Sequence, residues 1–158
     1  MPDNRLVCLV MLRTGLRVSD VLALKTAQLA RSFWVTEQKT GKRKHVGLPD
    51  DLIAEIKSRA LGSVWAFPSP RNPEKHRTRQ AVWKDIDRAA KAFRLPVNAG
   101  SHSMRKGYAV DLMHKYGDLE KVQKALNHDN PTVTMLYAMA DHLCASGAQR
   151  SKLYKRKR

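Results

Sequence analysis

The stretch SHSMRKGYAVDLMHKYGDLEKVQKALNHDNPTVTMLY, residues 101–137, decides what the rest of the fold has to bring together. It opens with a His-x-x-Arg pair, His102 and Arg105, and it closes with His128, which Tyr137 follows nine residues later. Two imidazoles, one guanidinium and one phenol therefore lie in a single short stretch. Each of these side chains alone is more often structural than functional. Whether they form a catalytic site therefore depends on the side chains that other segments add to them.

The charge of the whole chain indicates the class of partner. Its 158 residues include 30 Lys and Arg against 14 Asp and Glu, a formal net charge of +16. Such an excess predicts a polyanionic partner, and nucleic acid is the default. A membrane is the weaker option, since no apolar run approaches the roughly 20 residues that span a bilayer. Cys8 and Cys144 form no Cys-x-x-Cys pair and are read as reduced thiols.

The first seventeen residues predict a helix and a tight link. Arg5–Arg13 is mostly apolar and reads as a buried helix, which Gly15 ends. Ser19 is predicted to cap a short second helix with Asp20 in its first turn, where the helix dipole favours an acid. Arg17 therefore falls in the link between two helices. A side chain at such a position can be held rigidly and still point into a cleft.

A hairpin follows. Residues 33–38 and 43–48 both alternate apolar and polar residues, as half-buried strands do. Between them Lys39-Thr40-Gly41-Lys42 has the composition of a turn. The sequence therefore predicts an antiparallel hairpin with a lysine-rich tip.

The remaining segments show helical spacing between capping and breaking residues. Their predicted helices begin near Pro49, Thr78, Ser101 or Ser103, and Asp118. The predicted inner face of the third of them is Met104, Tyr108, Leu112 and Met113. Asn127 is expected in the left-handed conformation at a helix end. The predicted fold class is α+β and mainly helical, a helical bundle with a small antiparallel β-sheet or hairpin.

These residue types match one kind of chemistry. Direct attack on a phosphodiester needs a nucleophile, cations for the non-bridging oxygens, an acid for the leaving oxygen, and a group that handles the nucleophile's proton. Phenol, guanidinium, lysine among other cations, and imidazole can supply these four functions. The few acidic residues are dispersed, which disfavours a two-metal site. We therefore expect DNA strand breakage with no metal and no other cofactor.

The chain resembles the catalytic domain of tyrosine recombinases, the integrases of phages and mobile elements. Four boxes carry the resemblance in the family's order: Thr14–Leu24, Glu37–Pro49, His102–Arg105, and Leu126–His128 with Tyr137. Asn127 replaces the family's usual Gly, a change expected to matter little because Asn tolerates the same backbone conformation. The resemblance runs from Arg5 to about His142 and implies the tyrosine-recombinase catalytic fold.

The resemblance also implies a role for each matched residue. Tyr137 would attack the scissile phosphate, forming a 3′-phosphotyrosyl link and freeing a 5′-hydroxyl. Arg17 and Arg105 would hold the non-bridging oxygens. Lys39 would protonate the 5′-oxygen, and His102 would assist proton transfer with the nucleophile.

Further residues are expected to support this set. His128 would hydrogen-bond the phosphate. Asp20 would orient the catalytic side chains without contacting the phosphate itself. The other predicted DNA contacts are all basic: Lys42, Arg43, Lys44, Arg79 and Lys106.

Some of these assignments have rivals. Lys42 and Lys44 lie on the same hairpin as Lys39, whose role as the acid rests on motif register. Tyr154 is a rival nucleophile, in a basic tail with no His near it. The alternative functions are a type IB topoisomerase-like enzyme and a non-catalytic DNA-binding module. The His-x-x-Arg box and the nine-residue His–Tyr offset favour site-specific recombination or integration.

The expected organisation is a catalytic domain over residues 1–142 and a basic tail over 143–158. The family's N-terminal core-binding domain is expected to be absent, because there is no room for it before Arg5. The expected partners are double-stranded DNA and further copies of the chain, a tetramer on paired DNA sites and a monomer alone. Leu143 and Leu153 suggest that the tail docks on a neighbouring copy. The expected location is the cytoplasm of a prokaryotic cell, on DNA.

Overall fold

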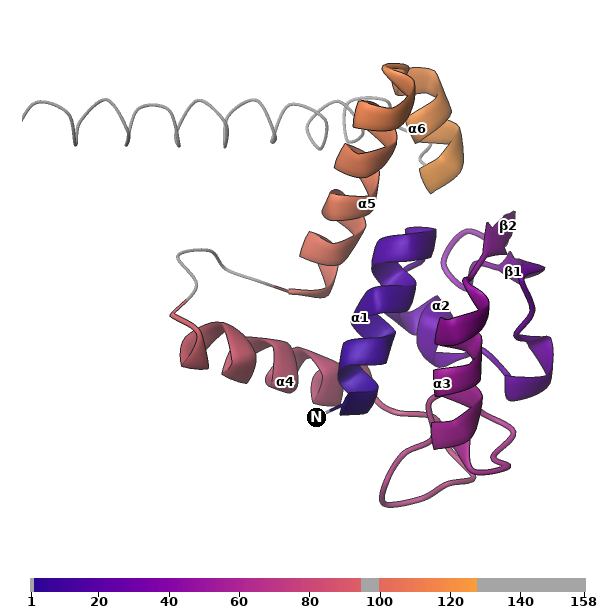
Figure 1. Cartoon of the computed structure of the whole chain (residues 1–158), viewed down its shortest axis with the longest axis vertical. Helices are drawn as coiled ribbons and strands as arrows, with labels where there is room; N and C mark the ends of the chain where they lie inside the picture. The colour runs from indigo at the N-terminus through magenta and orange to yellow at the C-terminus, as the bar shows by residue number, and fades with distance from the viewer. Residues whose placement is uncertain (1, 95–99, 128–158) are drawn as a thin grey trace, which may run out of the picture. The chain divides into compact units, whose positions relative to one another are not determined.

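The computed structural model describes residues 2–94 and 100–127. The chain divides into two compact units, Met1–Tyr108 and Ala109–Arg158. Figure 1 labels the α-helices and the strands but not the 3-10 turn η1. In chain order they are α1 (Pro2–Thr14), α2 (Val18–Leu22), the 3-10 turn η1 (Thr26–Gln28), β1 (Ser32–Thr36), β2 (Arg43–Gly47), α3 (Asp50–Ala60), α4 (Arg79–Ala92), α5 (Ser101–Tyr116) and α6 (Leu119–Leu126).

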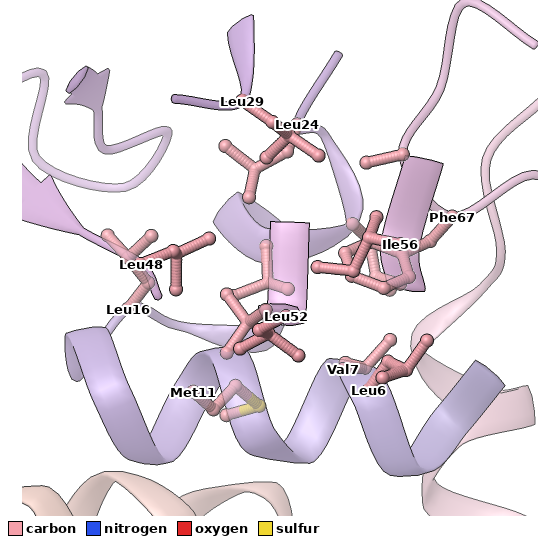
Figure 2. Packing of buried hydrophobic residues seen from close by; sticks show 14 of the residues in the cluster. Leu6, Val7, Met11, Leu16, Leu24, Leu29, Leu48, Leu52, Ile56 and Phe67 are labelled. Carbon is pink, nitrogen blue, oxygen red and sulfur yellow. The ribbon is translucent and has the colours of Figure 1, made fainter. Parts of the chain in front are cut away.

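The core of the first unit lies between α1, α3 and the hairpin. In Figure 2, Leu6, Val7 and Met11 of α1 point toward Leu52 and Ile56 of α3. These side chains recur every three or four residues, which places them on one face of each helix. Burying one such side chain stabilises a fold by about 1.5–3 kcal/mol. This cluster is therefore the rigid base on which the polar residues of the unit are mounted.

The hairpin forms where the sequence predicted it. Its two strands pair antiparallel, with Phe33 opposite Val46 and Val35 opposite Lys44. Alternate residues of each strand are buried, so one face of the hairpin covers the core. The turn closes through a hydrogen bond from the Gly41 amide to the Glu37 carbonyl at 2.8 Å, and Gly41 has a φ of +67°. The prediction of a hairpin with lysines at its tip is confirmed.

The predicted link around Arg17 is confirmed, but its cap is not. Gly15 ends α1 with a φ of +64°, and α2 begins at Val18. Ser19 lies inside α2, so its prediction as the N-cap was wrong. Arg17 occupies the N-cap position and makes no side-chain capping hydrogen bond. Extended backbone at Arg17 suits this position, and its side chain is left to interact elsewhere.

The start of α4 follows the prediction, and the inner face of α5 follows it only in part. Thr78 caps α4 by accepting a hydrogen bond from the Ala81 amide at 3.2 Å. On α5 the residues predicted to face inward are only partly buried. Arg105 is buried in their place, with 3% of its surface exposed. Met104 still packs against the core, as predicted, but the fully buried positions of α5 are Arg105 and Ala109, one residue further along. Arg105 was missed because the prediction gave buried positions only to apolar residues, whereas this guanidinium has polar partners inside the fold.

The described part of the second unit is the end of α5 and α6. Gly117 has a φ of +60° and ends α5, and Asp118 caps α6 by accepting from the amides of Glu120 and Lys121. Asn127 is left-handed, with a φ of 51°, as predicted. Within the described ranges, no helix combines the length and the apolar character needed to cross a membrane.

Candidate active site

Arg17 and Arg105 meet at one buried carboxylate. The Arg17 Nη1 donates to Glu37 Oε2 at 2.7 Å, and the Arg105 Nη1 lies 3.8 Å from Glu37 Oε1. The Glu37 side chain is fully buried and also accepts from the Thr40 hydroxyl at 2.8 Å. Arg17 comes from the α1–α2 link, Arg105 from α5 and Glu37 from the end of β1. One acidic side chain thus fixes the spacing of two guanidinium groups that are far apart in sequence.

Glu37 remains charged in this position. Burial by itself raises the pKa of a carboxyl, but the hydrogen bonds from Thr40 and Arg17 and the charges of Arg17 and Arg105 outweigh it. The net effect holds the pKa of Glu37 below its usual value. A buried anion between two cations is therefore present at neutral pH.

The backbone at Gly15 is part of the same assembly. Its carbonyl accepts a hydrogen bond from Arg105 Nη1 at 2.7 Å. A Cβ at this position would lie 2.2 Å from the Tyr108 ring, so only glycine permits both this close approach and the positive φ. Gly15 therefore ends α1 and at the same time allows α5 to bring Arg105 against the link.

Asp20 ties the link to the hairpin. Its side chain is buried, and Oδ1 accepts from the Gln38 amide at 2.9 Å. Burial is the main cause that raises the pKa of Asp20, the nearby Glu37 adds to it, and the Gln38 hydrogen bond opposes it. This contact fixes the residue before Lys39 relative to α2. Asp20 thus ties the hairpin turn to α2, next to Arg17.

These contacts frame a cleft of about 440 Å³. Among the described residues that line it, none is acidic. The lining residues come from α1, the link, α2, the hairpin turn, α4 and α5: Met11, Arg17, Val18, Ser19, Gln38, Lys39, Arg79, Ser101, His102 and Arg105. Guanidinium, ammonium and imidazole groups around one hollow make a site for an anion such as a phosphate.

Four of the six predicted catalytic residues line this cleft together: Arg17, Lys39, His102 and Arg105. His128 and Tyr137 lie outside the described residues. Among the predicted DNA contacts, Arg79 lines the cleft, whereas Lys42, Arg43 and Lys106 are exposed outside its lining.

Lys44 differs from its prediction as a surface DNA contact. It is buried, with 7% of its surface exposed, and its Nζ lies 5.0 Å from the centre of the Tyr108 ring. It shares the inward side of β2 with Val46, since alternate residues of a strand face the same way. Burial, followed by the charge of Arg105, lowers the pKa of Lys44 to about 7.

Sequence reasoning did not single out Glu37 as a functional residue, although a signal was present. Phe33 and Val35 are buried on the inner face of β1, and two-residue periodicity carries this row on to Glu37. A carboxylate in an inward row predicts a buried cationic partner. The same argument applied to the row of Lys44, Val46 and Leu48 would have found Lys44.

The sequence model of the phage integrase family matches residues 2–143. The chain belongs to this family. Its fold is the catalytic fold of tyrosine recombinases, so the resemblance drawn from the sequence boxes is confirmed at the level of family and fold.

Individual integrases and recombinases are similar in sequence to most of this chain. The chain is 30% identical over 135 residues to the probable integrase/recombinase YoeC of Bacillus subtilis, covering 82% of this chain and 74% of that protein. It is 27% identical over 150 residues to the tyrosine recombinase XerA of Pyrococcus furiosus, covering 89% of this chain and 52% of that protein. The chain thus spans about three quarters of the first relative and about half of the second.

Solved structures share the fold at low identity. The XerH site-specific recombinase bound to its difH substrate in a pre-cleavage complex has a TM-score of 0.69 at 23% identity, covering 85% of this chain and 42% of that chain. The XerA recombinase has a TM-score of 0.70 at 18% identity, covering 99% of this chain and 64% of that chain.

Proposed function

We propose that this chain carries the catalytic domain of a tyrosine recombinase, which breaks and rejoins DNA strands at specific sites through a 3′-phosphotyrosyl intermediate. The observation that carries the proposal is the cleft in which Arg17, Lys39, His102 and Arg105 stand together. They come from the α1–α2 link, the hairpin turn and α5. The names of the relatives, integrase and tyrosine recombinase, support the same reaction.

The cleft holds the scissile phosphate in this proposal. Arg17 and Arg105 bind its non-bridging oxygens, where negative charge grows in the transition state. Glu37 keeps their spacing fixed before DNA arrives, because it already binds Arg17 and lies beside Arg105. Preorganisation of this kind removes the cost of arranging the cations during the reaction.

The covalent step is a transesterification. The Tyr137 oxygen forms a bond to phosphorus while the bond from phosphorus to the 5′-oxygen breaks. His102 accepts the phenol proton, and the Lys39 ammonium gives a proton to the leaving 5′-oxygen. His128 donates a hydrogen bond to the phosphate, and Asp20 orients the cluster. A 5′-hydroxyl from another strand reverses the step and exchanges the strands, and no metal or cofactor takes part.

The wider organisation belongs to the same proposal. The catalytic domain covers residues 1–142, and residues 143–158 form a basic tail. The protein binds double-stranded DNA, works as a tetramer on paired sites, and acts in the cytoplasm of a prokaryotic cell. Lys42, Arg43, Arg79 and Lys106 contribute further DNA contacts, since all four are exposed basic residues.

The test uses nicked suicide DNA, in which the cut strand releases a short fragment and cannot be resealed. The target sequence is unknown, so the duplexes carry a randomised sequence around the nick, and the chain is incubated with this pool in EDTA. We expect a covalent protein–DNA adduct on a denaturing gel, which Tyr137→Phe abolishes and Tyr154→Phe keeps. Sequencing the DNA in the adduct then identifies the target.

Four outcomes would contradict the proposal. Absence of any adduct would leave a DNA-binding module without catalysis. An adduct that survives Tyr137→Phe would place the nucleophile elsewhere, and a requirement for metal would contradict the mechanism. Relaxation of supercoiled plasmid without strand exchange would favour the topoisomerase-like alternative, for which the described cleft offers no specific support.

A further inference from the structure

Lys44 is a buried amine beneath the cleft, and no step of the proposed reaction uses it. It lies opposite Val35 on the inner face of the hairpin, and Lys39 of the same hairpin lines the cleft. Its Nζ is buried and makes no hydrogen bond to any described residue. An ammonium in such a place is costly unless charges around it compensate. Its surroundings therefore decide whether the amine is charged.

Ionisable groups from three elements bear on Lys44. Arg105 and the Tyr108 phenol come from α5, Arg17 and Asp20 come from α2 and its N-cap, and Glu37 follows β1. The two arginines oppose a charge on Lys44, and the two carboxylates favour it. Lys39, His102 and Arg79 lie in the solvent-open cleft, where water screens their effect.

A bound phosphate changes the charge of this cluster. One phosphodiester against Arg17 and Arg105 adds one negative charge, and a proton on Lys44 offsets it. Without an anion, an ammonium at Lys44 adds a buried positive charge that the two arginines oppose. A neutral amine before binding and an ammonium after it therefore leave the net charge of the cluster unchanged.

Two carboxylate atoms of the cluster add to this picture. Glu37 Oε1 and Asp20 Oδ2 are buried without a hydrogen-bond partner, as Lys44 Nζ is. Buried polar atoms normally have hydrogen-bond partners, so three neighbouring atoms without one need an explanation, and a role in binding an anion is one. The pKa of Lys44, about 7, places a change in its charge in the physiological range.

We propose that Lys44 is a positioning residue for the phosphate clamp, and that its amine takes up a proton when a DNA phosphodiester binds to Arg17 and Arg105. Protonated Lys44 neutralises the charge that the phosphate brings and keeps Glu37 and the two guanidinium groups in place. DNA binding and protonation are then coupled, so DNA binds more weakly as the pH rises above about 7. The inference deepens the proposed function and rests on its placement of a phosphate in the cleft.

The first test counts protons. A short duplex is titrated into the chain by calorimetry at low salt, in buffers of different ionisation enthalpy. At pH 8 we expect the wild-type chain to take up about one proton more per bound protein than Lys44→Met, because Lys44 is then mostly neutral before binding. At pH 6 the two should agree, since Lys44 is already protonated. The control Lys57→Met removes an exposed positive charge on α3 and should leave proton uptake at the wild-type value.

A second test measures the titration of Lys44 directly in the wild-type chain. The Cε resonance of Lys44 is followed by NMR against pH, with and without the duplex, and Lys44→Met serves only to assign it. We expect a midpoint near 7 in the free chain and a higher midpoint with DNA. An equal proton uptake in wild type and Lys44→Met, or a midpoint that DNA does not move, would overturn the inference.

The two proposals fail in different ways. If the adduct forms on nicked DNA in EDTA and proton uptake does not depend on Lys44, the inference fails and the recombinase function stands. If proton uptake depends on Lys44 and no adduct forms, the phosphate site stands and the catalytic function fails.

Discussion

Each face of the β1–β2 hairpin holds exceptions to the usual distribution of residues. On the outer face, Trp34 is 53% exposed, and its ring centre lies 4.9 Å from that of His45 with the two rings tilted. The Arg43 guanidinium lies 4.9 Å over the Trp34 ring. On the inner side, Glu37 and Lys44 are buried. An aromatic ring thus lies in water while two charged groups lie in the interior.

The difference shows what each face is for. The apolar part of the inner face packs on the core, and its charged end supports the cleft by binding the arginines. Burying charges costs free energy, so their presence favours a role for the cluster beyond stability. The outer face only covers the sheet, and its contacts are exposed and weak. Substitutions on the inner side should therefore matter most for activity and show pH dependence, whereas those on the outer face should not.

The largest expected effect comes from removing the shared anion. Glu37→Ala leaves two guanidinium groups beside each other without their carboxylate, which should lower the rate of adduct formation on the order of 100-fold through misplacement of the clamp. The rate of adduct formation on suicide DNA measures this effect. Glu55→Ala is the control, since Glu55 pairs with Arg5 on the partly exposed surface of α3. Equal rates for the two variants would show that the inner carboxylate does not organise the clamp.

A large effect on stability is expected at Gly15, and Gly41 in the hairpin turn is the control position. Gly15→Ala places a Cβ 2.2 Å from the Tyr108 ring at a φ of +64°, and should cost about 3 kcal/mol of stability. Gly41→Ala has a similar φ of +67° with no atom within 4 Å, and should cost about 1 kcal/mol. Urea unfolding of both variants measures the difference. Similar costs would mean that the close approach of α5 to the link is not a constraint.

Lys44→Met should stabilise the chain in a pH-dependent way. The pKa of Lys44 falls from 10.5 to about 7 on folding, so the unfolded chain binds more protons between these values. The cost of burying the ammonium is therefore full below pH 7 and is lost as the pH rises toward 10.5. We expect Lys44→Met to gain up to ~5 kcal/mol at pH 6 and less than ~1 kcal/mol near pH 10. A gain that does not vary with pH would show that Lys44 is charged throughout.

The outer face should give the smallest effect. Trp34→Ala removes the cross-strand contact with His45 and the stacking of Arg43, and should cost about 0.5–1 kcal/mol. Thermal unfolding at pH 6 and pH 9 measures it. A cost of several kcal/mol, or one that varies with pH as for Lys44→Met, would remove the distinction between the two faces.

Much of the fold follows from local rules. Periodicity predicts α1, α3 and the hairpin, and capping chemistry predicts Thr78, Asp118 and the left-handed Asn127. These features depend on neighbours in sequence. Arg17 in its link was predictable for the same reason, since Gly15 and the short second helix mark the boundaries.

The charged cluster depends on contacts that local rules do not contain. Glu37 binds Arg17 twenty residues away in sequence, and Arg105 reaches the Gly15 carbonyl ninety residues away. Hydrophobic patterning assigns charged residues to the surface, and so it misplaced Lys44 and part of the inner face of α5. Ser19 was misassigned because serine is a common cap, whereas the link geometry places Arg17 there.

The different roles assigned to the two hairpin lysines, Lys39 and Lys44, can be tested chemically. Lys39 lines the cleft and is the proposed acid for the leaving 5′-oxygen, whereas Lys44 lies buried beneath it. A suicide substrate with sulfur in place of the scissile 5′-oxygen has a leaving group that needs no proton, because a thiol is far more acidic than an alcohol. We predict that Lys39→Ala forms little adduct with the oxygen substrate and recovers with the sulfur substrate, while Lys44→Met shows no such recovery. Recovery of Lys44→Met alone would contradict this division and make the buried lysine the acid.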